Sequence, residues 1–130
     1  MSQENVEVVR DMLDAFNRDD LEAVIASYEE GCEIVEPPEM PVLGYRGHQG
    51  VREWMANPGG TAQAEFKPRA FTATGDLVLC ELVSRGLGQA SGAPIEWTTF
   101  AVVRVRTGKI AQVRVFLSRE QALDAVGLSE

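Results

Sequence analysis

The sequence predicts an α+β domain in which a curled antiparallel sheet wraps round N-terminal helices. The first 28 residues repeat apolar side chains at helical spacing, whereas residues 62–117 hold four long β-type segments separated by turn signals. Helices followed by a run of strands are typical of the α+β class. Because the chain has 130 residues, 45% of them apolar, we expect a single domain spanning residues 1–130.

The N-terminal part predicts two helices in succession. The first begins after Ser2 as N-cap and repeats its apolar side chains at Val6, Val9, Leu13 and Phe16. Asp19 followed by Glu22 resembles a capping box. It leads into a second, shorter helix over Leu21–Tyr28, which Gly31 ends.

The middle of the chain predicts a short strand, a loop and a third helix. Cys32–Glu36 reads as a strand closed by Pro37, because a residue before proline favours extended backbone. A loop rich in proline and glycine then reaches Gly47. Residues 48–55 fit a short helix, and the Asn-Pro-Gly-Gly run at 57–60 breaks it.

The second half predicts four antiparallel strands and a closing helix. The strands are expected at residues 62–73, 77–86, 94–106 and 109–117. Ser118 with Gln121 matches a capping box, and a helix from there would stop at Gly127.

Composition excludes several classes of partner and site. Twenty acidic against twelve basic residues give a net charge of −8, so nucleic acid is not an expected partner. The chain has no apolar run long enough for a membrane helix and starts without a signal-like segment, so we expect a cytoplasmic protein away from the membrane. Cys32, Cys80 and the single His48 are too few for a disulfide framework or a metal centre, and no cofactor is expected.

Alternation along the strands predicts a homodimer. Leu77 and Leu79 alternate with Val78 and Cys80, so this strand presents apolar side chains on both faces. Residues 95–105 show the same pattern. Helices can cover one face of the sheet, and a twin subunit would be the simplest cover for the other.

Three segments resemble a known family. They are Glu4–Leu21, with its Phe-Asn-Arg-Asp-Asp turn, then Gly44–Trp54, and finally Thr107–Leu117. In this order and spacing they resemble the SnoaL-like polyketide cyclases of the nuclear-transport-factor-2-like superfamily. The likeness covers almost the whole chain and implies a cone-shaped, cystatin-like fold. Function does not follow from it directly, since this scaffold carries isomerases, cyclases, hydrolases and binding modules.

The resemblance implies a deep, mostly apolar pocket between sheet and helices. Ketosteroid isomerases of the superfamily keep a catalytic aspartate before a proline at the end of the first strand, and Glu36 before Pro37 has this place. Their helix tyrosine corresponds to Met12, and their protonated aspartate corresponds to Phe100 or Ala101. None of these three side chains donates a hydrogen bond, so steroid isomerisation is not implied.

The resemblance also suggests the residues of the pocket wall. Tyr45 and Trp54 would flank the mouth, and Met12, Phe100 and Val113 would contact the substrate. The protein would be a cofactor-independent isomerase, cyclase or hydrolase acting on a small apolar molecule by acid-base catalysis, with its substrate unassigned. The alternative is a non-catalytic dimeric module that binds a hydrophobic ligand, and a protein-interaction domain is a third possibility.

Glu36 is the candidate catalytic residue on the strand pattern alone. Cys32, Ile34 and Glu36 share one strand face, so a carboxyl group ends a row that is otherwise apolar. Burial would raise the pKa of this group toward neutrality, where a general acid or base works best. In the opposing interpretation Glu36 is solvated at the rim and belongs to an acidic cluster with its neighbours Glu33 and Glu39.

Charged residues on the predicted strands allow two interpretations. The strands that must pass each other carry Arg104, Arg106 and Arg114 together with Glu81, Arg85 and Glu96, which favours cross-strand ion pairs. An arginine turned inward would instead provide a clamp for a substrate carboxylate.

Overall fold

The computed structural model describes residues 2–40, 43–56, 61–88 and 91–127. Within these ranges, two helices, two strands and a third helix precede four further strands and a last helix. Their bounds are α1 Ser2–Asn17, α2 Leu21–Ala26, β1 Tyr28–Val35, β2 Gly44–Arg46, α3 Gly47–Ala56, β3 Thr61–Thr74, β4 Leu77–Gly88, β5 Pro94–Arg106, β6 Lys109–Phe116 and α4 Arg119–Ala125. The predicted α+β class, with helices at the N-terminus, is confirmed.

The sheet is mixed, whereas the sequence predicts an antiparallel one. Its strands lie in the order β2-β1-β6-β5-β4-β3, and the four long strands are antiparallel neighbours as predicted. The difference arises at β1, which pairs in parallel with β6. Strand β2 lies within the predicted loop, where Tyr45 pairs with Ile34 of β1. The side-chain period of two does not reveal this order, because it is the same for parallel and antiparallel neighbours.

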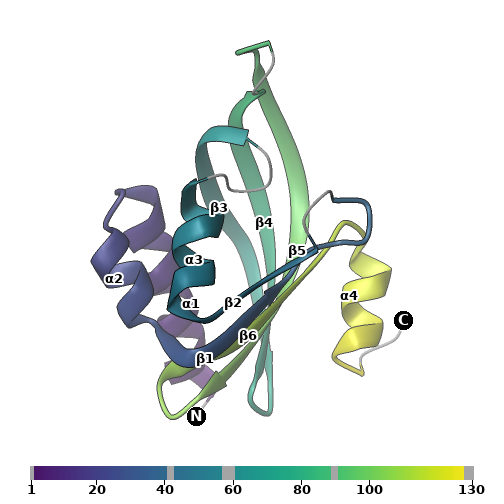
Figure 1. The fold of residues 1–130 in the computed structure, drawn as a ribbon. Helices are drawn as coiled ribbons and strands as arrows, with labels where there is room; N and C mark the ends of the chain where they lie inside the picture. The colour runs from purple at the N-terminus through teal and green to yellow at the C-terminus, as the bar shows by residue number, and fades with distance from the viewer. Residues whose placement is uncertain (1, 41–42, 57–60, 89–90, 128–130) are drawn as a thin grey trace.

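Helices α1, α2 and α3 lie on one side of the sheet, and α4 lies on the other (Figure 1). Helix α1 packs against β3 and β4, and its predicted apolar stripe is buried at Val6, Val9, Leu13 and Phe16. Helix α3 packs against β1 on the same side. None of the helices in the described ranges has the length and apolar character that crossing a membrane requires.

The ends of the short helices follow the capping rules, with one correction. Asp20, rather than Asp19, is the N-cap of α2, and its side chain accepts a hydrogen bond from the Ala23 amide at 3.2 Å. Ser118 caps α4 as predicted, accepting from the Gln121 amide at 3.3 Å. The helix break predicted at 57–60 lies outside the described residues.

Helix α4 covers an apolar area on the second face of the sheet. Ala122 of α4 is fully buried and packs with Leu79 and Val102, and Phe100 and Phe116 join this cluster. Helix α4 therefore covers part of the sheet face that the sequence predicts to be covered by a twin subunit.

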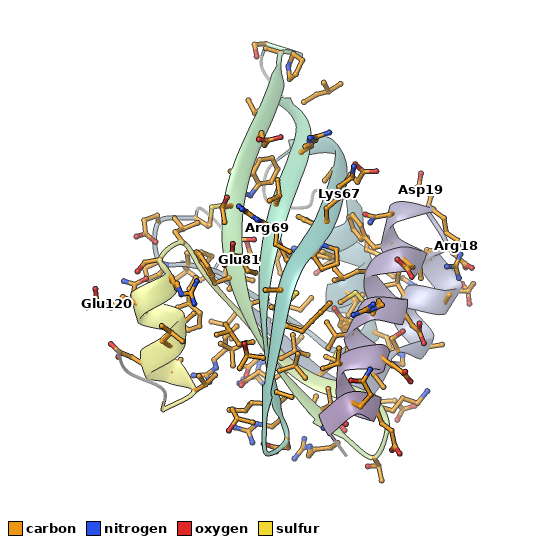
Figure 2. The ribbon with its side chains drawn as sticks, turned by 180° about the vertical axis from the view of Figure 1, so that it is seen from behind. Arg18, Asp19, Lys67, Arg69, Glu81 and Glu120 are labelled. Atoms are coloured by element: carbon orange, nitrogen blue, oxygen red, sulfur yellow. The ribbon has the colours of Figure 1, made fainter. Side chains whose placement is uncertain are left out.

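Beyond α4, charged side chains occupy the same face, where Lys67, Arg69 and Glu81 are visible in Figure 2. The Arg69 Nε lies 3.6 Å from a carboxylate oxygen of Glu81, joining β3 to β4. Arg119, the first residue of α4, lies 3.6 Å from the other oxygen of that carboxylate. A network of ion pairs thus lies beside α4, on strands β3 and β4.

Candidate functional site

A cavity of about 280 Å³ lies between the inner face of the sheet and the helices. Its wall takes every second residue of β5 along one face, namely Ile95, Trp97, Thr99, Ala101 and Val103, and Glu96 also borders it. The two-residue period therefore predicts correctly which β5 side chains share a face. Helix α1 closes the cavity opposite the sheet through Val9, Met12 and Leu13.

Glu36 lines this cavity directly after the end of β1. Its side chain is buried, with 9% of the residue exposed, and Ile34 lines the cavity on the same strand face. Cys32 is buried in the core rather than along the cavity wall. The Glu36 amide donates to the Leu43 carbonyl at 2.8 Å, which fixes the backbone where the carboxyl group leaves the strand. The interpretation of Glu36 as a solvated rim residue is wrong.

Burial raises the pKa of Glu36 above the ordinary glutamate value of 4.5, because the charged form loses its water. A hydrogen bond from the Trp54 side chain favours the carboxylate and partly opposes this shift. A carboxyl group with a raised pKa can be present in both protonation states nearer to neutral pH. It can therefore accept or donate a proton inside the apolar cavity.

The raised pKa of Glu36 predicts that the free energy of unfolding depends on pH. The folded state holds this proton more tightly than the unfolded state, so the wild-type chain loses stability as the pH rises from 4.5 through the folded-state pKa. Glu36→Gln removes the ionisation. We expect this variant to gain stability relative to wild type between pH 4 and pH 8, measured by urea unfolding at both values. An identical pH dependence in the two proteins would contradict the raised pKa.

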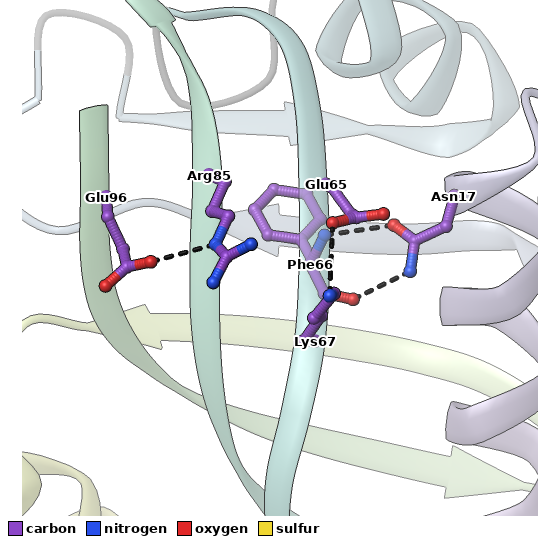
Figure 3. A network of polar contacts seen from close by, with 6 residues as sticks. All are labelled: Asn17, Glu65, Phe66, Lys67, Arg85 and Glu96. Atoms are coloured by element: carbon purple, nitrogen blue, oxygen red, sulfur yellow. Dashed lines mark hydrogen bonds and ion pairs between the residues drawn. The ribbon is translucent and has the colours of Figure 1, made fainter. Parts of the chain in front are cut away.

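An aromatic cluster holds Trp54 against Glu36. The Trp54 ring of α3 lies 5.2 Å from Phe16 and 5.8 Å from Phe66, measured between ring centroids. Phe66 of β3 is fixed to the end of α1, because the Asn17 amide group donates to its carbonyl at 2.8 Å and accepts from its amide at 2.9 Å (Figure 3). Elements α1, α3 and β3 thus jointly determine the position of the indole.

Three of the predicted substrate-binding residues line the cavity, and two do not. Met12, Trp54 and Val113 are part of its wall, although their contact with a ligand stays a prediction. Phe100 does not line the cavity as predicted, because it lies on the opposite face of β5 and packs under α4. Tyr45 does not line the cavity either, since it packs against the core outside the cavity wall. Helical and strand periodicity places residues on faces, but only packing decides which face borders a cavity.

Tyr28 is a cavity residue that the sequence pattern does not predict. Spacing from Leu21 suggests the end of a helix there, whereas α2 ends at Ala26 and Tyr28 begins β1. The pairing of β1 with β6 shifts register between Tyr28 and Glu33, so the two-residue period counted back from Glu36 does not reach Tyr28. The His48 Nε2 lies 2.9 Å from the Tyr28 carbonyl oxygen and donates to it, so this histidine has a structural role.

The predicted arginines form ion pairs or hydrogen bonds away from the cavity. Arg104 pairs with Asp76 at 2.7 Å and Arg106 with Glu29 at 2.6 Å. Arg114 donates to the carbonyl of Ala125 in α4 at 3.4 Å. In the described part of the chain, the residues lining the cavity include no lysine, arginine or histidine. The arginine clamp is therefore wrong.

A cross-strand ion pair of the predicted kind joins β4 to β5. Arg85 of β4 donates to Glu96 of β5 at 2.8 Å, and Figure 3 shows this pair beside the Asn17 contact with Phe66.

The two cysteines are buried thiols. Cys80 lines the cavity, and burial raises its pKa to about 12, so it stays protonated and is a poor nucleophile. Burial also raises the pKa of Cys32. No three histidine, cysteine, aspartate or glutamate residues within the described ranges are grouped to hold a metal ion.

Several solved structures share this fold. TerC, co-crystallised with polyporic acid, is 19% identical with a TM-score of 0.79, and the match covers 96% of this chain and 97% of TerC. A nuclear-transport-factor-2-like protein of unknown function from Burkholderia pseudomallei is 20% identical with a TM-score of 0.80, covering 98% of both chains. A protein with a ketosteroid isomerase-like fold from Catenulispora acidiphila, in complex with trimethylamine, is 18% identical with a TM-score of 0.74, covering 94% and 93%. At these identities the likeness shows the fold.

The family is shown by the sequence. No curated protein matches the chain. The model of the SnoaL-like domain matches residues 9–113, which span the chain from α1 to β6. This match includes Met12, Glu36 and Val113 of the cavity wall. The chain therefore belongs to the SnoaL-like domain family.

Proposed function

We propose that this protein is a cofactor-independent enzyme that transfers a proton on a small apolar molecule held in the cavity. One observation carries the proposal: Glu36 is a buried carboxyl group with a raised pKa in a largely apolar wall. Such groups are enriched at catalytic sites because a pKa near the working pH favours both uptake and release of a proton. TerC, which has the same fold, was co-crystallised with polyporic acid, which supports binding of a small molecule by a protein of this fold.

The chemistry that fits Glu36 is removal of a proton from carbon beside a carbonyl group. The carboxylate would take the proton, and the electron pair of the broken C–H bond would move into the adjacent C–C bond while the carbonyl electrons move to oxygen. Return of a proton from Glu36 to a carbon atom would restore a neutral product. Trp54 would hold the carboxylate through its indole N–H, and Met12 and Val113 would contact the apolar body of the substrate.

Proton exchange tests this function without knowledge of the natural substrate. α-Tetralone is a mostly apolar ketone with two exchangeable hydrogens beside its carbonyl group. In deuterated buffer the wild-type protein should speed the loss of their proton NMR signal over buffer alone. Bound ketone with no protein-dependent exchange would contradict enzymatic proton transfer.

The second candidate function is a non-catalytic module that binds a hydrophobic ligand. It is favoured by the cavity wall, in which apolar side chains far outnumber polar ones. The same NMR experiment separates the two functions, because a binding module would hold α-tetralone without exchanging its protons.

The homodimer predicted from the strands stays a proposal. Helix α4 covers part of the second sheet face, and the rest of that face carries both apolar side chains such as Val83 and charged ones such as Arg69. Sedimentation at micromolar concentration should report a particle of twice 14.2 kDa. A single chain of 14.2 kDa under these conditions would contradict the dimer.

A further inference from the structure

The hydroxyl group of Tyr28 is a buried donor with a weak acceptor. Tyr28 is 3% exposed and lines the cavity. Within the described part of the chain, its hydroxyl donates to the Met12 sulfur at 3.9 Å. A thioether is a poor acceptor compared with a carbonyl oxygen. The contact with the Met12 sulfur therefore uses only part of the hydrogen-bonding capacity of this hydroxyl.

The lining of the cavity determines the charge of a suitable ligand. Val9, Leu13 and Val103 are apolar residues of the same cavity wall as Tyr28, and the Cys80 thiol in that wall is protonated. Burial also raises the pKa of Tyr28, so the phenol stays a donor. The described lining offers no cationic side chain to an anion, and transferring an unpaired charge into such surroundings is costly. An uncharged acceptor fits.

We propose that Tyr28 is a specificity-determining residue that selects uncharged apolar molecules with an acceptor oxygen, such as a ketone, over hydrocarbons of the same shape. On ligand entry the hydroxyl leaves the Met12 sulfur and donates to that oxygen. This inference rests on the proposed function, since it assumes that the cavity is the ligand site.

The size of the cavity indicates a fused two-ring ligand. A cavity of about 150 Å³ holds one benzene molecule. The volume here, about 280 Å³, is nearly twice as large. α-Tetralone and its hydrocarbon counterpart tetralin are therefore matched probes that differ in the carbonyl oxygen.

Binding of both probes, measured by calorimetry, tests the role of Tyr28. Tyr28→Phe should weaken α-tetralone binding by about 3- to 10-fold, the value of one buried neutral hydrogen bond, and leave tetralin binding unchanged. Met12→Leu is the matched control, because it removes the sulfur acceptor and keeps the donor. It should retain the preference for the ketone.

A spectroscopic signature distinguishes hydrogen bonding from a change in cavity shape. The infrared carbonyl stretch of bound α-tetralone should lie at lower frequency in wild type and Met12→Leu than in Tyr28→Phe, because donation to the oxygen weakens the C=O bond. Equal frequencies in the three proteins, or equal loss of affinity for both probes, would overturn the assignment. Absence of ketone binding to wild type, or tighter binding of the anion naphthoate than of α-tetralone, would also overturn it.

The role of Tyr28 in ligand preference and the role of Glu36 in proton transfer can be tested separately. If Tyr28 has no such role, Tyr28→Phe will bind both probes as wild type does, while proton exchange still depends on Glu36. If Glu36 is not the proton-transfer group, exchange will not depend on it, while the preference for ketone still depends on Tyr28.

Discussion

Glu36→Gln is expected to lower the protein-dependent exchange of the α-tetralone protons by about 10²- to 10⁴-fold, the usual contribution of a positioned general base. Glutamine has nearly the same shape but cannot take up the proton, so binding of the ketone should change little. Exchange is followed by proton NMR in deuterated buffer, and binding by calorimetry on the same samples. Loss of exchange with retained binding would identify Glu36 as the base.

The control for this variant is the same change at a distant position. Glu120 is exposed on α4, on the opposite side of the sheet from the cavity (Figure 2). Glu120→Gln should exchange the ketone protons at the wild-type rate. In wild type, exchange should rise with pH through the raised pKa of Glu36, because only the carboxylate accepts a proton. A Glu36→Gln protein that retained both the rate and this pH profile would exclude Glu36 as the base.

Phe16→Ala is expected to have the largest effect on stability, a loss of about 3–5 kcal/mol in the free energy of unfolding. Phe16 is 5% exposed, and its ring lies 4.9 Å from Phe66 and 5.2 Å from Trp54 between centroids. Its removal would leave a void where α1, α3 and β3 meet. Urea unfolding measures the difference.

Two controls show whether the lost packing is the cause. Phe16→Leu keeps much of the buried volume and should cost distinctly less than alanine. Leu21→Ala removes an apolar side chain that is 37% exposed, and should cost about 1 kcal/mol or less. A Phe16→Ala protein as stable as Leu21→Ala would show that the aromatic cluster does not stabilise the fold.

Trp54 connects these two predictions. It packs against Phe16 and Phe66 and also donates a hydrogen bond to Glu36, so one side chain joins the core to the candidate base. The sequence places Trp54 near a pocket only through a family resemblance. Its contact with Glu36 depends on α3 packing against β1, which no local pattern encodes.

Several features of the site could be predicted from the sequence because they depend on local geometry. The two-residue period places Ile34 and Glu36 on one face, and it groups the inward residues of β5 correctly. A proline after Glu36 ends the strand and leaves the carboxyl group at its end. These rules act over a few residues and need no information on neighbouring elements.

Other features were decided by packing between distant segments. The family resemblance predicts Phe100 in the cavity, but this residue lies under α4. Helical spacing predicts Tyr28 in a helix, but this residue lines the cavity. The parallel pairing of β1 with β6 joins residues such as Ile34 and Val113, which are far apart in the chain.

The sequence by itself determined the helices, the long strands and the alternation of their faces, because hydrophobic periodicity and turn residues are local properties. The tertiary structure alone decided which face encloses the cavity and which helix covers the other face. It also decided that Glu36, Trp54 and Tyr28 share one site. Those outcomes depend on long-range contacts that bury both faces of one sheet, and an apolar residue has the same local pattern on either face.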